Sequence, residues 1–163
     1  AYFGAGKIDE TILCYQAANE AAVQSEDDTV GPKLDVQTRM AEGSALVSAE
    51  RYKEAADVFA NAVPLAKKVA DQTAELECAR MAGWCFEVDG DANQAWDWGE
   101  QAVAAGAAMD EANRETSTLP YAGQMLIRLA DNGTHADRKS AVQDQMEMLL
   151  GSNWESALEG AAV

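Results

Sequence analysis

The sequence predicts an all-α protein built from successive helical hairpins, and three observations support this. Only three prolines interrupt 163 residues, alanine is abundant, and the alternating β-branched runs typical of strands are missing. Apolar residues recur three or four positions apart along most of the chain, as on one face of a helix. Gly43, Gly83 and Gly123 are 40 residues apart, and periods of roughly 20–50 residues indicate stacked supersecondary units.

The first helix is expected over about residues 8–22, where apolar side chains fall on one face. A loop is expected to follow, from the acidic run at 26–28 to Gly31 and Pro32. Proline cannot donate a backbone hydrogen bond, and it disfavours helix in the residue before it.

The best-formed hairpin is expected to join a helix at 34–49 to a helix that begins at residue 52. The connection is so short that the two helices must pack antiparallel. Gly43 and Ala55 lack bulk, so they allow the two backbones to approach closely. Pro64 falls inside the second helix and predicts a kink or a local break there.

The next hairpin is expected to begin at Asp71, a residue type that caps helix N-termini, and to turn at Gly90. A third hairpin is expected to begin near Thr118, as a cap, with Pro120 in the first turn. Its second helix is expected from about His135 to Leu150, where Gly151 ends it.

After Gly151, Ser152 and Glu155 fit a capping box and predict a short terminal helix. The whole chain, 1–163, is expected to form one helical domain. Its predicted parts are about 1–30 as the second half of a truncated repeat, 34–70 as hairpin 1, 71–115 as hairpin 2, 118–150 as a degenerate hairpin 3, and 152–160 as the terminal helix.

The residues around the three glycines resemble the tetratricopeptide repeat family. In that family a small residue on the first helix is followed by an aromatic, an alanine, an aromatic and an alanine on the second. The residues that carry the resemblance are Gly43, Tyr52, Ala55, Phe59 and Ala62 in the first copy, Gly83, Phe86, Ala95 and Ala102 in the second, and Gly123 in the third.

The later copies depart from this pattern. Ala92 and Gly99 stand where aromatics are expected, and the third copy degrades after its glycine, as a capping repeat would. The resemblance implies a right-handed superhelix, or solenoid, of antiparallel hairpins. The 40-residue period exceeds the usual period of about 34, which implies longer helices. By this resemblance the chain is expected to begin in the middle of a repeat, so we expect a fragment of a longer protein or a piece trimmed from one.

Charge and composition narrow the function. Lys and Arg total 12 against 28 Asp and Glu, a net charge of −16. This charge repels phosphate backbones and anionic lipids, so neither nucleic acid nor membrane is an expected partner. We expect a cytoplasmic protein because no signal peptide or apolar span is visible. The three cysteines, Cys14, Cys78 and Cys85, are expected to be reduced and buried.

No motif predicts an enzyme, a metal site or a cofactor. Oxygen-bearing residues at 89–100 fall at several offsets of a calcium loop, but Gln94 occupies the position that needs glycine. His135 is the only histidine and is expected to be a surface cap, so histidine-pair metal motifs are excluded. Phosphate-binding glycine motifs are missing as well.

In the family, the first helices line a concave groove that receives a partner peptide. Aligned on the three glycines, the resemblance implies a groove lined by Met40, Ser44, Val47, Arg80, Trp84, Glu87, Gln124, Ile127 and Arg128. Trp84 beside Arg80 could anchor a ligand, or could simply pack between hairpins.

The expected function is a non-catalytic protein–protein interaction scaffold that binds an unidentified protein, as a peptide or helix, in this groove. The alternative is a ligand- or peptide-sensing regulatory domain of a larger signalling or transcription protein. Self-association also stays open, because Trp96 and Trp98 cannot share a helix face. If Trp96 fits the core, Trp98 faces outward.

Overall fold

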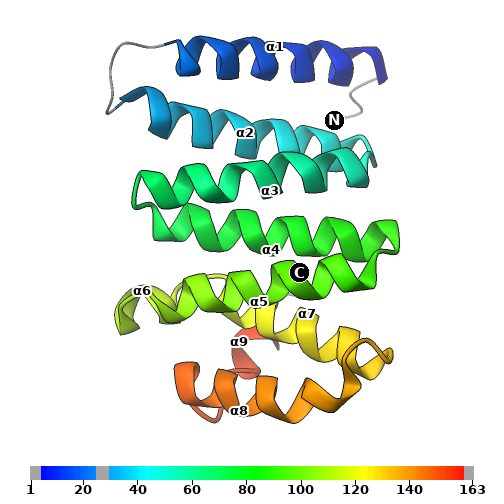
Figure 1. Cartoon of the computed structure of the whole chain (residues 1–163), viewed down its shortest axis with the longest axis vertical. Helices are drawn as coiled ribbons and strands as arrows, with labels where there is room; N and C mark the ends of the chain where they lie inside the picture. The colour runs from blue at the N-terminus through cyan, green and yellow to red at the C-terminus, as the bar shows by residue number, and fades with distance from the viewer. Residues whose placement is uncertain (1–4, 25–29, 160–163) are drawn as a thin grey trace.

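The computed structural model describes residues 5–24 and 30–159, and within them the secondary structure is entirely helical (Figure 1). This confirms the predicted all-α class. The helices are α1 (Ala5–Val23), α2 (Val30–Ser48), α3 (Tyr52–Lys68), α4 (Gln72–Asp89), α5 (Ala92–Ala107), α6 (Glu111–Glu115), α7 (Leu119–Asp131), the 3-10 helix η1 (Ala136–Arg138), α8 (Lys139–Leu150) and α9 (Ser156–Glu159).

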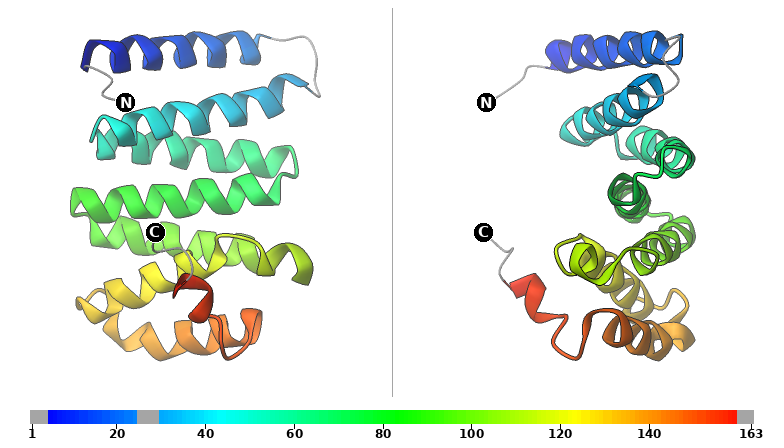
Figure 2. Two further views of the ribbon diagram at one scale, coloured as in Figure 1. Left: turned by 180° about the vertical axis from the view of Figure 1, so that it is seen from behind. Right: turned by 90° about the vertical axis from the view of Figure 1, so that its left-hand side faces the viewer.

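The long helices pack in chain order. Each of α1 to α4 packs against the next helix, α7 packs on α5, and α8 packs on α7. In the right-hand view of Figure 2, α2 and α4 lie on one side of the row, and α3 and α5 lie on the other. The last helix, α9, lies on the same side as α2 and α4 and packs on α7.

One apolar core runs along the row, from Ile12 in α1 to Trp154 beside α9. Its largest fully buried side chains include Trp96, Phe59 and Leu126, each at most 2% exposed. Trp96 therefore lies in the core, as its position on α5 predicted. Trp98, on the same helix, is partly buried against the core rather than fully exposed.

The turns inside successive hairpins share one geometry. Glu50, Gly90 and Gly133 each adopt a left-handed backbone conformation, with φ of 59°, 92° and 98°. After each of them, the next backbone N–H donates to the carbonyl five positions earlier, over 2.9–3.0 Å. This bond closes the end of the preceding helix. The sequence pattern identifies the turns at the two glycines, whereas glutamate gives no such signal.

The start of α2 corrects the expected loop. The helix begins at Val30, so Gly31 and Pro32 lie in its first turn. Proline is tolerated there because its missing N–H has no helical partner in the first turn. The acidic run at 26–28 lies outside the described residues.

Of the kink or local break expected at Pro64, the break is absent, because α3 runs without interruption to Lys68. The proline is exposed, while Val63 and Ala66 beside it are buried in the core. Packing of this face holds the helix together across the missing backbone donor. Helical stability in proteins comes mostly from such tertiary contacts.

Some of the predicted helix starts agree with the structure and others do not. The Asp71 side chain accepts from the backbone N–H of Ala74 over 2.9 Å, which confirms the predicted cap, and Pro120 lies in the first turn of α7. The Thr118 side chain makes no cap bond to α7. Two further starts are later than expected: α8 begins at Lys139 after a 3-10 turn, and α9 begins at Ser156, four residues after Ser152, the proposed cap.

Candidate functional site

The nine residues predicted to line a groove lie on α2, α4 and α7, and we call them the groove face. Three of them, Ser44, Gln124 and Arg128, are exposed, and the other six are partly buried. The face therefore combines exposed polar groups with apolar side chains that still have free surface: Met40, Val47, Trp84 and Ile127.

Trp84 contacts the preceding hairpin through Tyr52. The two rings meet edge to face, with centroids 5.8 Å apart and planes at 84°. This is a favoured arrangement for aromatic pairs. Both side chains are only partly buried, so Trp84 joins two hairpins and also keeps an accessible part.

The guanidinium group of Arg128 is already engaged. Its Nε and one terminal nitrogen donate to the two Glu87 oxygens over 2.7 and 2.6 Å. The paired Glu87 carboxylate raises the pKa of Arg128, because the hydrogen bonds stabilise its charged form. This fork joins α4 to α7 across the groove face, between residues 41 positions apart.

Arg80 is held in the same way by Glu77, over 2.6 and 3.0 Å. The Thr118 hydroxyl donates to this carboxylate over 2.8 Å, which makes a second link between α4 and the start of α7. Burial alone would raise the pKa of Glu77, but the bonds from Arg80 and Thr118 outweigh it, and the pKa lies below its usual value. Both groove-face arginines are thus neutralised by the chain itself.

The C-terminal segment lies on the groove face. Trp154 is 7% exposed and belongs to the core, and Leu158 packs against that core. Together with Glu155 they line a pocket of about 360 Å³, whose opposite wall is Gln124 and Ile127 of α7. An apolar pair four residues apart signals such a segment in the sequence, but it does not indicate where the segment docks.

The repeated glycines lie where two helices of one hairpin cross. A Cβ atom at Gly43 would lie 2.6 Å from the ring of Phe59 on α3. One at Gly83 would lie 3.1 Å from the backbone carbonyl of Ala95 on α5, and one at Gly123 would lie 2.7 Å from Met146 on α8. These distances are below normal contact, so the glycines permit close helix approach. The aligned residues Ala55, Ala62, Ala95 and Ala102 are fully buried, with 0% exposure.

A buried carboxylate joins α1 to α2. Glu42 is 5% exposed, and its two oxygens accept from the side-chain amides of Gln16 and Asn19, each over 2.9 Å. Asn19 also accepts from the Thr38 hydroxyl. These bonds compensate the loss of water at Glu42. The cluster is a structural link that apolar periodicity does not reveal.

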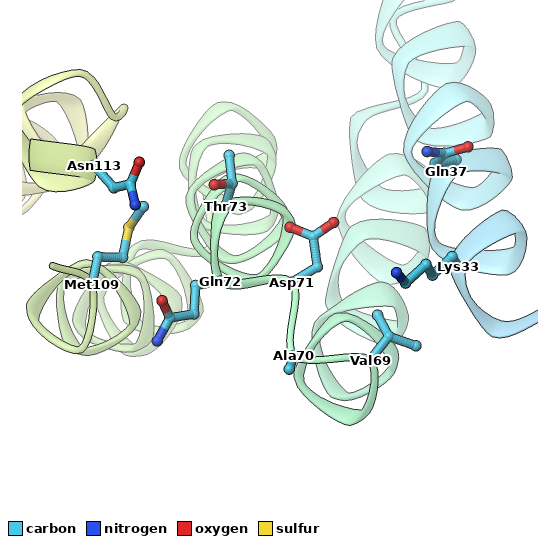
Figure 3. Close-up of a pocket in the computed structure, with 9 residues that line it drawn as sticks. All are labelled: Lys33, Gln37, Val69, Ala70, Asp71, Gln72, Thr73, Met109 and Asn113. Carbon is cyan, nitrogen blue, oxygen red and sulfur yellow. The ribbon is translucent and has the colours of Figure 1, made fainter. Parts of the chain in front are cut away.

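A second pocket, of about 340 Å³, opens at the far ends of the hairpins (Figure 3). Its lining is mostly polar and joins the start of α2, the turn between α3 and α4, and the region after α5. Asp71 already caps α4, and the Gln72 amide donates to the carbonyl of Ala108 over 3.1 Å. Lys33 and Gln37 are exposed at its edge.

Two of the three cysteines match the predicted environment. Cys78 and Cys85 are fully buried, whereas Cys14 is exposed on α1, so its predicted burial is wrong. Cys14 lies on the side of α1 opposite the buried Ile12 and Asn19. Burial is the main reason that the pKa of Cys78 is raised to about 12, and repulsion from Glu77 and Asp71 adds to it. Burial raises the pKa of Cys85 to about 11 against the attraction of Arg80.

We expect an alkylating reagent at pH 8 to modify only Cys14 in the folded protein. At these pKa values no more than about one in a thousand of the two buried thiols is ionised, and the thiolate is the reactive form. Intact-mass spectrometry should show one adduct under native conditions and three in denaturant. Native modification of Cys78 or Cys85 at the rate of Cys14 would contradict this assignment.

His135 does not act as a side-chain cap. It adopts a left-handed conformation, with φ of 52°, and its ring lies 4.9 Å from the ring of Trp96. Arg138 covers the same indole at 5.5 Å and pairs with Glu100. Within residues 5–24 and 30–159, no three acidic, histidine or cysteine side chains gather as metal ligands would. In this same part of the chain, no helix has the length and apolar character that crossing a bilayer requires.

Comparisons with protein-family models, curated proteins and solved structures found no match to this chain. Any functional assignment therefore depends on the geometry of the chain itself.

Proposed function

We propose that this protein is a non-catalytic interaction scaffold, which binds a segment of a partner protein on the groove face. In this proposal the chain is a tetratricopeptide-like solenoid with a period of about 40 residues and a right-handed superhelical path. The close crossings at Gly43, Gly83 and Gly123 support the period. The matching turns at Glu50 and Gly90, also 40 residues apart, support it independently.

The observation that carries the proposal is the position of the C-terminal segment. An indole and a leucine four residues apart lie on the groove face, against Ile127 and Gln124. The face therefore has the shape and apolar surface to accept a short peptide with such anchors. Binding of an amphipathic segment through residues spaced by one helical turn is a common recognition mode.

The charges on the face define the partner further. Arg80 and Arg128 are both occupied by glutamates, so they do not attract a partner carboxylate. The chain carries a net charge of −16, which favours approach by a neutral or basic segment. The expected partner peptide combines an aromatic or aliphatic anchor with neutral or basic neighbours.

The alternative is a regulatory domain that senses a small ligand, and the polar pocket of Figure 3 is one candidate site for it. That pocket is a weaker candidate for a binding site than the groove face. Its Asp71 carboxylate and Gln72 amide are already bonded within the chain. Ligand sites are usually enclosed and mainly apolar, and this one is open and polar. We therefore prefer the groove face.

Selection of a random peptide library on the 163-residue chain tests the proposal. Enriched peptides should bind at least about tenfold more weakly to Trp84→Ala and Ile127→Glu, a loss typical of a central anchor. Trp98→Ala is the matched control, because it removes a partly buried tryptophan from α5. It should leave the affinity nearly unchanged. Peptides that lose affinity for Trp98→Ala alone would place the site elsewhere and contradict the proposal.

A further inference from the structure

We propose that residues 150–159 are an internal ligand of the groove face, which a partner peptide must displace in order to bind over α7. This proposal rests on the proposed function and adds a regulation to it. The chain would inhibit its own binding site, and partner segments would share the chemistry of this one: a tryptophan followed, four positions later, by a leucine.

The segment is held on the face by apolar contact. Trp154 is buried to 7% exposure and Leu158 is partly buried, while Glu155 and Ser156 are exposed. Trp154 and Leu158, together with Glu155, line a pocket that they share with Gln124 and Ile127 of α7. Tryptophan is among the residue types enriched at binding hot spots.

The polar bonds of the segment's described residues, by contrast, are local. The backbone N–H of Trp154 donates to the carbonyl of Gly151, and that of Leu158 donates to Glu155. The hydroxyl and backbone N–H of Ser156 both donate to the carbonyl of Asn153. These bonds would survive if the segment left the groove face, so its release breaks mainly the apolar contacts.

Gly151 provides a pivot between α8 and the segment. Its φ of 84° lies in a region that glycine adopts without strain, and its N–H donates to Glu147 at the end of α8. The segment can therefore detach while α8 stays packed on α7. The pocket beside the segment leaves additional space at the same place.

The test uses a fluorescent synthetic peptide with the sequence of residues 150–159 and the 163-residue chain. In the variant Trp154→Ala/Leu158→Ala the internal segment has lost both anchors, so the groove face is free. If the segment occupies the face nine-tenths of the time, wild-type protein binds the peptide about tenfold more weakly than the variant. Fluorescence anisotropy measures both affinities.

Two controls locate the binding. Adding Ile127→Glu to the variant should abolish peptide binding, whereas Leu13→Glu, an equivalent change at an exposed residue of α1, should leave it unchanged. A peptide with alanine in place of Trp154 should not bind. Circular dichroism verifies folding. If the double variant does not fold, Leu158→Ala alone replaces it, with the same expected direction.

The proposal is overturned if the variant does not bind the peptide, if it binds no more tightly than wild type, or if binding survives Ile127→Glu. These results would leave the scaffold function standing whenever library peptides bind elsewhere on the groove face, around Trp84. Loss of library-peptide affinity for Trp98→Ala alone, with Trp84→Ala unaffected, would instead contradict the proposed function. The two failures are therefore distinguishable.

Discussion

Replacing Trp96 with alanine should lower the free energy of unfolding by about 3–5 kcal/mol, the range for truncation of a large buried aromatic. Its side chain is fully buried in the core on α5, which packs against α4 and α7, and His135 and Arg138 cover its ring. A small domain has only about 5–15 kcal/mol of stability in total. Urea unfolding followed by circular dichroism measures the loss without depending on tryptophan fluorescence.

Trp96→Phe tests the contribution of the indole N–H separately from that of the buried ring. The indole Nε1 of Trp96 is buried without a hydrogen-bond partner in the described structure, so phenylalanine removes an unsatisfied donor as well as some packing. We expect a cost of only about 1–2 kcal/mol. A cost equal to that of Trp96→Ala would show that the N–H has a partner in solution, such as an ordered water.

The elements that the sequence predicted well depend on local chemistry. Apolar periodicity located the long helices, and Gly90 and Asp71 marked a helix end and a helix start. The interval between Gly43, Gly83 and Gly123 pointed to the places where helices cross closely. Each of these signals lies within a few residues of the feature it predicts, or repeats at a fixed interval.

The features that could not be predicted from the sequence depend on tertiary contacts. Arg114 is an example: its guanidinium donates to the carbonyls of Gly106, Ala107 and Met109 at the end of α5, and to Leu149 at the end of α8. No motif predicts an arginine that closes two helix ends. The residue lies on the short helix α6, which the periodicity did not predict either.

The contacts of the groove face also could not be predicted from the sequence. Alignment on the three glycines predicts that Arg80, Trp84 and Arg128 share one surface, but it does not reveal that Arg128 is already paired. Whether an arginine is free depends on a glutamate that folding brings beside it, and Glu87 lies 41 positions from Arg128. The docking of Trp154 on α7 has the same origin, since an apolar pair near a chain end fits many surfaces equally well.

Phe59→Ala should cost about 3–5 kcal/mol in the free energy of unfolding, because the ring is 1% exposed and fills the crossing of α2 and α3. Gly43→Ala should also destabilise, since its new Cβ would lie 2.6–2.9 Å from three atoms of this ring. Overpacking costs about 1–3 kcal/mol, partly offset by the better helix propensity of alanine. Urea unfolding of each variant measures the two costs.

The two changes should compensate each other when combined. With the Phe59 ring removed, the methyl group at position 43 no longer meets it and instead occupies part of the cavity. The double variant should therefore be more stable than the sum of the single effects predicts, by about 1–2 kcal/mol, within the range for residues in contact.

Val142→Ala supplies the matched control for this coupling. Val142 is buried in α8, and no packing between α2 and α8 appears among the main helix contacts of the described chain. Its effect should add to that of Gly43→Ala within about 0.5 kcal/mol, as expected for distant sites. Additivity in the Gly43–Phe59 pair as well would mean that the backbone moves apart to accommodate the methyl group. In that case the contact with the Phe59 ring would not be the reason that position 43 requires glycine.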